Sequence, residues 1–573
     1  MAAWWAPKPL KPVQRLMPML AGVLVAAASS TAQAQAQAEP AAAPTVPTAP
    51  AAAPTDAAGA QAKPQAAATV AVSGYQVLGN TLLPAADIEA RLVPFKGVLT
   101  VQRLRDAAAA VQDLYRRAGY GGVVAFLPEQ ALGSGVVVVR VVEGKLDRID
   151  ISGLQQFTVD NLLASLPDLV KGRTPNVRRI DAQIQLANES PAKTVQVLLQ
   201  PGSTPGTVAA KLTVAEQPVQ RWTARADNTG SRSNGRWRAA LGWQHGNVLG
   251  QDHVFSTEWQ TAPEDVSGVA VLSAAYRVPL YQHSVALDAY GAFSDVSSAK
   301  TSTAAGDLQF SGRGHIVGAR GTLYLPRWDT LDHRVSLGLE SRDYLNDCSI
   351  AGLPAGACGS AGASVSLQPL SLAYTAQAGG ELRAGVSVSL HHNLGLGGSH
   401  TKAEDFEAVR AGAVRRYTLL RGSGQVSLPV QEWGTLALRV SAQASGQPLV
   451  PGELFGVGGA QSVRGFEERE LAGDSGLQAS AEFTSPNLAD KLPGLKDAEL
   501  RVLVFADGGY VSSLKGAPCL PGETRCHMAS VGAGLRLAYS QALLRLDLGT
   551  ALTDATTTAR GDVRLHLGLS VSF

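Results

Sequence analysis

Charge is scarce in this sequence, and long apolar runs are missing from all but its N-terminus. Charged residues make up 17% of the 573 residues and leave a formal net charge of +2, against a usual charged share of ~25%. These values exclude a highly charged disordered chain and argue against a dedicated nucleic-acid binder. No uninterrupted apolar run of ~18 residues follows the N-terminus, so we expect no transmembrane helix.

Glycine is plentiful by comparison, with 60 residues in the chain, above the usual share of ~7%. The mean hydropathy is close to balanced, at +0.04. A glycine-rich, weakly charged chain of this length without a spanning helix fits two broad classes, a soluble all-β protein and a membrane β-barrel.

The N-terminus indicates export. Basic residues, the last of them Arg15, precede a short apolar stretch at 16–28 and a run of alanines with Ala-x-Ala spacing. This order is typical of a signal peptide, to which we assign residues 1–38. Residues 39–68 are almost only Ala, Pro, Thr and Gln, a composition that cannot bury a core and predicts a flexible linker.

The four cysteines agree with export. Cys348 and Cys358 fall in one glycine- and alanine-rich stretch, and Cys519 and Cys526 fall near proline and glycine in another. Of the pairings that four cysteines allow, two local disulfides are the economical choice, and we favour them over free thiols. No Cys-x-x-Cys pair and no histidine stands at ligand spacing, so we expect no metal site.

Two small α/β units follow the linker, at 69–145 and 146–218. Each is predicted as a strand, two helices and two strands. The expected elements are 70–78, 84–92, 101–118, 122–127 and 135–142 in the first unit, and 146–151, 159–166, 177–188, 194–200 and 207–215 in the second. An exposed edge of such a sheet can capture an extended chain as an added strand, although two ordinary α/β domains would have the same pattern.

The remaining residues, 219–573, predict an antiparallel membrane β-barrel. In 563–573 Val and Leu share one face, Arg, His, Gly and Ser share the other, and the strand ends on the aromatic Phe573 as a barrel terminus. Polar inward faces on many strands, and tryptophans confined to this region after the signal peptide, favour lipid and a wet lumen over a soluble sandwich.

Sixteen strands are predicted in this region, an even number. They are 219–228, 235–245, 251–260, 266–278, 283–293, 313–325, 333–345, 364–377, 381–391, 411–428, 435–445, 477–485, 499–507, 530–540, 542–550 and 563–573. We see no convincing helix among them. With both ends of the barrel in the periplasm, connections from odd to even strands face outward, and both cysteine pairs fall in such connections.

Several motifs carry a family resemblance. Residues 115–149 resemble the first POTRA (polypeptide-transport-associated) domain of the two-partner secretion transporters, the TpsB class that secretes and activates haemolysins and filamentous adhesins. Residues 227–231 and 247–252 look like the start of their barrel. Gly-Gly-Ala-Gln-Ser-Val-Arg-Gly-Phe at 458–466 is similar to their loop-six signature, and Phe-Ala-Asp at 505–507 matches a Phe-x-Asp strand motif.

The resemblance implies a transmembrane β-barrel of sixteen antiparallel strands carrying two periplasmic POTRA domains. Loop six would fold back into the lumen through Val463, Arg464, Gly465 and Phe466, with Arg464 against the Phe-x-Asp strand. The alternation on that strand independently points Phe505 and Asp507 inward, and inward Glu482 is a second possible partner. Some family members also carry an N-terminal plug helix, which the prolines of 39–68 make doubtful here. Sealing would then fall to loops.

The implied function is translocation of a protein across the outer membrane of a Gram-negative bacterium. The POTRA domains would capture an unfolded haemolysin- or adhesin-like exoprotein, which then crosses the lumen without nucleotide hydrolysis. Outer-membrane lipid and the barrel-assembly machinery are the other expected partners. No catalytic motif, cofactor site or nucleic-acid site is expected. The alternatives are a barrel-assembly factor of the same superfamily and, from another class, a passive porin-like channel.

Overall fold

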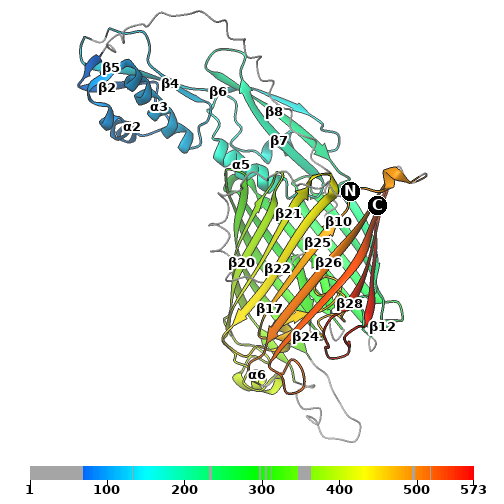
Figure 1. The fold of residues 1–573 in the computed structure, drawn as a ribbon. Helices are drawn as coiled ribbons and strands as arrows, with labels where there is room; N and C mark the ends of the chain where they lie inside the picture. The colour runs from blue at the N-terminus through cyan, green and yellow to red at the C-terminus, as the bar shows by residue number, and fades with distance from the viewer. Residues whose placement is uncertain are drawn as a thin grey trace, which may run out of the picture.

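The computed structural model describes residues 69–573, apart from 132, 232–234, 296–298, 304–305, 311–312, 346–362, 493, 495–496 and 516–517. The expected signal peptide and linker lie outside the described residues, as do Cys348 and Cys358. Two α/β units stand above one end of a large barrel, with the second unit directly against the rim (Figure 1). Among the helices of the described part, none is long and apolar enough to cross a membrane.

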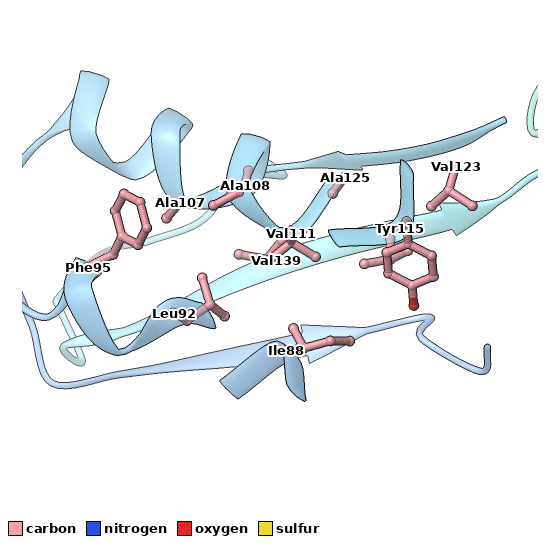
Figure 2. Packing of buried hydrophobic residues seen from close by; sticks show 12 residues of the cluster. Ile88, Leu92, Phe95, Ala107, Ala108, Val111, Tyr115, Val123, Ala125 and Val139 are labelled. Atoms are coloured by element: carbon pink, nitrogen blue, oxygen red, sulfur yellow. The ribbon is translucent and has the colours of Figure 1, made fainter. Parts of the chain in front are cut away.

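The first unit is a three-stranded sheet covered by two helices. Its main elements are β2 (Gly74–Leu78), α2 (Ala85–Leu92), α3 (Val101–Arg117), β4 (Val123–Phe126) and β5 (Val136–Glu143). The sheet order is β2-β5-β4, with β2 parallel to β5 and β4 antiparallel to it. Figure 2 shows Val111 of α3 beside Val139 of β5, with Tyr115 further along the helix in the same cluster. One face of α3 is apolar and packs on the sheet, because Leu104, Ala108, Val111 and Tyr115 are all buried.

The strand expected at 70–78 is in fact two strands. β1 (Thr69–Val72) pairs with an unexpected short strand, β3 (Gly97–Thr100), whereas β2 pairs with β5. The break lies at Ser73, where the amides of Ser73 and Gly74 both donate to the carbonyl of Gly135 (2.7 and 3.3 Å). That shared acceptor turns the chain from one sheet into the other.

The second unit repeats the plan of the first. Its elements are β6 (Lys145–Ser152), α4 (Val159–Ala164), α5 (Val177–Ala187), β7 (Lys193–Pro201) and β8 (Thr207–Glu216), with sheet order β6-β8-β7. Thr158 and Asn176 cap the two helices by accepting backbone N–H groups with their side chains. Side-chain caps of this kind satisfy amides that have no partner within the helix.

The two units meet where helix α3 ends and helix α5 begins. The carbonyl of Gly119 accepts the amide of Val177 (2.8 Å), and the carbonyl of Ala118 accepts the side-chain amide of Asn176 (3.0 Å). Arg178 also donates to the carbonyl of Arg117 (2.8 Å). Unpaired carbonyls at one helix end thus meet donors at the start of the other, an arrangement that the two helix dipoles favour.

The barrel closes on itself with sixteen strand positions, as predicted. β18 and β19 both pair with β17 and form one position, interrupted at Gln368. The strands are β9 (Gln220–Asp227), β10 (Arg238–Val248), β11 (His253–Ala262), β12 (Asp265–Leu280), β13 (Val285–Ser294), β16 (Arg313–Trp328), β17 (Leu331–Leu345), β18 (Val365–Leu367), β19 (Pro369–Ala378), β20 (Arg383–Asn393), β21 (Thr418–Val430), β22 (Gly434–Ser445), β25 (Ser475–Thr484), β26 (Ala498–Ser512), β27 (Arg525–Tyr539), β28 (Ala542–Ala551) and β29 (Val563–Ser572).

Side-chain exposure follows the alternation that the sequence predicts. On β26, Val502 and Val504 are 44% and 57% exposed, whereas Phe505 and Asp507 are 5% and 4% exposed. The apolar side chains therefore face outward toward lipid, and the polar side chains face the lumen. On β29, outward Leu565 and inward His566 show the same contrast.

The barrel region departs from the expected pattern of sixteen strands in a helix, a shortened strand and two additional hairpins. Helix α6 (Ala403–Val409) contradicts the expectation that the barrel region has no helix. The strand expected at 411–428 begins only at Thr418, because the preceding residues pack over the barrel mouth together with α6. The remaining additions are two hairpins, β14 (Ala299–Thr303) with β15 (Gly306–Phe310), and β23 (Phe455–Val457) with β24 (Leu471–Gly473).

The seam between the first and last strands closes the barrel. β29 pairs with β9 from Gly568↔Asp227 to Ser572↔Thr223. Phe573 extends this pairing, since its backbone N–H and C=O both bond to Trp222 (2.9 and 2.7 Å). Beyond Asp227 the side chain of Asn228 replaces the strand, donating to the carbonyl of Leu565 (2.7 Å) and accepting the amide of Leu567 (2.8 Å).

A buried ion pair attaches the second unit to the barrel. Lys193 on β7 donates to Asp252, in the turn between β10 and β11 (2.6 Å), and to Asn161 of α4 (2.7 Å). The side chains of Lys193 and Asp252 are 0% and 1% exposed. Burial lowers the pKa of Lys193, an effect that the Asp252 carboxylate opposes. Burial beside the same carboxylate raises the pKa of Tyr281, which donates to Asp252 (2.8 Å).

Helix α5 reinforces this attachment along the rim. Glu189, just beyond its end, pairs with Arg277 of β12 (3.3 Å) and Arg334 of β17 (3.0 Å). Gln185 donates to the carbonyl of Leu325 on β16 (3.0 Å), and Leu186 packs among buried side chains of the rim. The second unit is therefore fixed to the barrel at the turn after β10 and again along α5.

Replacing Lys193 by alanine should loosen this attachment. The change leaves Asp252 buried without its cation, which costs about 3–5 kcal/mol in comparable pairs. We expect faster hydrogen exchange at the 249–252 turn and faster protease cleavage within the second unit, while the barrel stays folded on a heat-modifiability gel. Arg179→Ala removes an exposed partner of Asp168 and serves as the control. Unchanged protection in Lys193→Ala would show that the ion pair does not fix the unit.

Candidate functional site

Loop six, residues 446–474, connects β22 to β25 at the barrel end away from the two α/β units (Figure 1). β23 and β24 pair with each other, so the chain between them doubles back. We call residues 458–470 the tip of loop six. Val463, Arg464 and Phe466 in this tip are each at most 2% exposed. Such complete burial means that the tip is packed inside the barrel.

Arg464 binds the carboxylate of Asp507 on β26 through two parallel hydrogen bonds. Its Nε donates to Oδ2 (2.7 Å) and its Nη2 donates to Oδ1 (2.9 Å). The backbone amide of Arg464 donates to the same carboxylate (3.1 Å). Two parallel N–H···O bonds to one carboxylate fix the orientation of the guanidinium as well as its position.

Carboxylates from two further strands surround the same guanidinium. Its Nη1 donates to Glu482 on β25 (2.7 Å) and lies 3.5 Å from Asp547 on β28. Asp547 in turn pairs with Arg536 (2.8 Å) and Arg545 (2.6 Å). The charges alternate around the site, so no buried charge is left without a counter-charge.

Phe505 supplies an aromatic floor beneath the arginine. The guanidinium carbon of Arg464 lies 3.4 Å from the centroid of the Phe505 ring. Gly532 on β27 provides the space for this ring, because a Cβ there would lie 2.3 Å from a Phe505 ring atom. A desolvated guanidinium over an aromatic face is attracted by about 2 kcal/mol.

Gly465 brings the tip against the strand wall. Its φ of +96° is a conformation that glycine adopts readily and other residues rarely do. Its amide donates to Nε2 of His566 on β29 (2.9 Å). Opposite it, Gly549 of β28 leaves room for the tip, since a Cβ at that position would lie 2.6 Å from the Gly465 nitrogen.

An apolar cluster supports the tip on the extracellular side. Val463 and Phe466 pack with Leu471, Val511 and Met528, and with the disulfide between Cys519 and Cys526. The structure thus contains one of the two local disulfides expected from the sequence, and it lies beside the loop-six signature. A disulfide that closes so short a loop removes about 2.5 kcal/mol of chain entropy from the unfolded state in the loop-closure account.

The tip also holds the last outward loop of the barrel. Glu470 accepts the backbone amides of Thr557 and Thr558 (both 2.7 Å) and the hydroxyl of Thr558 (2.7 Å). Glu467 pairs with Arg564 at the start of β29 (2.9 Å). Loop six therefore contacts every strand from β25 to β29 directly or through the connecting loops.

The structure brings together the residues that the sequence indicated for the lumen: Val463, Arg464, Gly465 and Phe466 meet Phe505, Asp507 and Glu482. Phe573 lies elsewhere, at the seam. Sequence reasoning did not assign His566, Asp547, Arg545 or Glu470 to the site. Alternation puts the first three on the lumen face, but no sequence signal pairs them with a loop about a hundred residues away. Within the described ranges, no cluster of three or more His, Cys, Asp or Glu could hold a metal.

Comparison with known protein families gives two matches. Residues 206–537, more than half of the chain, match the family described as haemolysin secretion/activation protein ShlB/FhaC/HecB. Residues 70–144 match the ShlB-type POTRA domain, which corresponds to the first α/β unit.

Individual proteins show the same likeness. The outer membrane transporter CdiB of Escherichia coli is 26% identical over 505 residues, which cover 82% of this chain and 79% of the relative. The outer membrane transporter CdiB of Dickeya dadantii is 24% identical over 412 residues, which cover 71% of this chain and 69% of the relative. The solved structure of CdiB from Escherichia coli shares the fold with a TM-score of 0.70 at 21% identity, covering 88% of this chain and 91% of that one. The solved structure of CdiB from Acinetobacter baumannii has a TM-score of 0.65 at 16% identity, and the match covers 88% of this chain and 90% of that one.

Gly549→Ala should displace the tip of loop six. The added methyl would meet the backbone of Gly465, and overpacking of this kind costs about 1–3 kcal/mol. We expect faster hydrogen exchange at the amides of Arg464 and Gly465. Gly568→Ala on the neighbouring strand is the matched control, because its new Cβ would have nothing closer than 4.0 Å. Equal exchange in the two variants would mean that Gly549 is not needed for seating the tip.

Proposed function

The chain belongs to the haemolysin secretion/activation protein family ShlB/FhaC/HecB, the outer-membrane transporters of two-partner secretion, and on that basis we propose how it handles its partner. The periplasmic POTRA domains, which we assign to 69–145 and 146–218, capture an unfolded exoprotein. The exoprotein then passes through the barrel lumen to the cell surface when the tip of loop six leaves its binding site on the inner faces of strands β25 to β29. We call this binding site the seat of the tip. No nucleotide is consumed.

The observation that supports this route most strongly is how the tip is held. Loop six is covalently continuous only with β22 and β25, so ion pairs, hydrogen bonds and apolar packing alone hold its tip against β26 to β29. The ion pairs of Arg464 are stable when the lumen is closed, and the separated charges are hydrated when water enters. Such a seat can be left and regained, as a transport cycle requires.

Capture is proposed to begin at a groove on the first POTRA domain. A cavity of about 530 Å³ lies between α3 and the β4 edge. Phe126 on β4 and Val101 on α3 line it and are 40% and 41% exposed. Apolar side chains beside the edge of a sheet suit an extended, apolar segment of an unfolded protein.

Two glutamine side chains occupy main-chain bonding positions in this groove. Gln130 donates to the carbonyl of Val138 (2.8 Å) and accepts its amide (2.7 Å), which continues the pairing of β5 where β4 has ended at Phe126. Gln112 accepts the amide of Ala125 on the outer edge of β4 (3.2 Å). A strand added beside β4 would use the backbone amide of Ala125, so the side chain of Gln112 protects this edge until an incoming strand displaces it.

Arg464→Ala should reduce export of the exoprotein on the order of tenfold or more, while the barrel still inserts. The variant leaves buried Asp507 without its cation and Glu482 with Arg439 alone (3.3 Å), so the tip cannot regain its seat. Export is measured as exoprotein in the medium, and insertion as heat-modifiable migration. Arg501→Ala, on the same strand face but paired with Glu499 and 38% exposed, is the control. Full export by Arg464→Ala would refute the proposed role of the tip.

A photo-crosslinking residue at position 126 should capture the exoprotein in living cells. Position 98 is the control, because Val98 is apolar and 73% exposed but does not line the groove. We expect one large secreted protein in the adduct at position 126 and little at position 98. Adducts with many outer-membrane precursors would instead indicate a barrel-assembly factor. Equal adducts at both positions would remove the groove from the proposal.

A further inference from the structure

A second buried arginine–carboxylate pair lies near the outer mouth of the barrel. Arg410, at the end of α6, donates to both oxygens of Asp474, immediately before β25 (2.6 and 2.7 Å). The two side chains are 3% and 0% exposed. The same guanidinium donates to the carbonyls of Leu449 (2.5 Å) and Lys515 (3.0 Å). This pair is as deeply buried as the Arg464–Asp507 pair and is likewise bidentate, through Nη1 and Nη2 here and through Nε and Nη2 there.

Asp474 joins four segments at this point. Besides Arg410, its carboxylate accepts the amide of Leu449 at the start of loop six (2.7 Å) and the amide of Leu514 after β26 (2.7 Å). The segment carrying α6, both ends of loop six and the β26–β27 loop therefore converge on one carboxylate. Removing Arg410 would break the contact of the α6 segment with Asp474 and the bonds of Arg410 to two carbonyls, while the amides of Leu449 and Leu514 would stay on the carboxylate.

The segment that Arg410 secures is residues 394–417, which connects β20 to β21 and which we call the lid. Phe406 of α6 and Tyr417 are at most 1% exposed. They pack with Tyr344 of β17 and with Leu449 and Val450 of loop six. The lid thus covers the β17–β21 side of the mouth, whereas the tip of loop six occupies the β25–β29 side. In Figure 1, α6 lies at the barrel end opposite the POTRA domains.

The base of loop six closes the space between these two sides. Glu453 in η5 (Pro451–Glu453) pairs with Arg342 of β17 (2.5 Å) and Arg421 of β21 (3.1 Å). Its backbone carbonyl accepts the side chain of Gln443 on β22 (2.8 Å). Loop six consequently touches the lumen wall on both sides, and displacing its tip alone leaves its base and the lid across the mouth.

We propose that the lid is an outer gate, and that the Arg410–Asp474 pair is a latch that must open separately from the Arg464 seat before a polypeptide can leave the barrel. The inference rests on the proposed route through the lumen. The contacts of the two arginines are distinct: Arg464 binds Asp507, Glu482 and Ser480, and Arg410 binds Asp474 and two carbonyls. Residues without shared partners act on a protein close to additively.

The latch has the chemistry of a reversible gate. A buried pair of this kind is often no more stable than an apolar contact of equal size, because two charges must leave water to form it. When the lid lifts, Arg410 and Asp474 regain water at the extracellular mouth, and hydration offsets part of the lost pairing.

The test is single-channel recording of the full-length protein in planar lipid bilayers. Arg410→Gln removes the charge and the bidentate bond, and we expect the fraction of time spent conducting to rise about tenfold or more. Arg410→Lys keeps the charge but cannot make the two parallel hydrogen bonds to Asp474. Its conducting fraction should lie between that of the wild type and that of Arg410→Gln. The control is Arg313→Gln, whose exposed pair with Asp295 lies at the same end of the barrel. Heat-modifiable migration and the Cys519–Cys526 disulfide verify folding in each variant.

Two results would overturn the latch. The first is an Arg410→Gln protein that is folded but conducts as the wild type does. The second is an Arg464→Ala/Arg410→Gln double variant that conducts no more than Arg464→Ala alone, which would mean a single gate. Conductance needs no exoprotein, so the latch is tested apart from the proposed route. Failure of that route would appear in the export assay with Arg464→Ala.

Discussion

A hydrocarbon bilayer offers the protein backbone no hydrogen-bond partner, and the architecture follows from that constraint. The sheet must close, so the last strand has to find the first. Here the pairing continues past β29 to Phe573, which exchanges two backbone hydrogen bonds with Trp222. At the other end of the seam the side chain of Asn228 substitutes for missing strand. The Asp-Asn-Thr motif at the start of the barrel thereby acquires a structural meaning as a seam closure.

Closing the sheet creates an interior that has to be filled without being sealed permanently. The chain fills it with loops whose contacts are ionic at the decisive points, Arg464 on one side of the lumen and Arg410 and Glu453 on the other. Apolar filling would have been at least as stable. Paired charges that tolerate both burial and water allow the same loops to be withdrawn. Gly549 lets the tip of loop six approach the wall closely, and Gly532 makes room for the Phe505 ring beneath Arg464, which accounts for part of the glycine excess.

Sequence alone predicted the barrel well because its signal repeats along every strand. The alternation on β26 assigned Phe505 and Asp507 to the lumen, and the structure agrees. The lid was missed because α6 spans only seven residues, too few for a helical period to show. Residues 411–417 were assigned to the strand that follows them, but they continue the segment of α6 and pack with it instead. The partners of Lys193 and Arg410 could not be predicted, since they lie 59 and 64 residues away and no local pattern links them.

The helix-to-helix junction between α3 and α5 has a consequence for the exported protein. Donors at the start of α5 hold the end of α3, and Glu189 beyond α5 grips the barrel rim. These contacts fix the position of the groove beside α3 relative to the pore entrance. On the route proposed above, only cargo sequence beyond a minimum spacer can reach the lumen while a segment stays bound in this groove. That route makes the spacer length a property of the transporter, which its cargo would have to match.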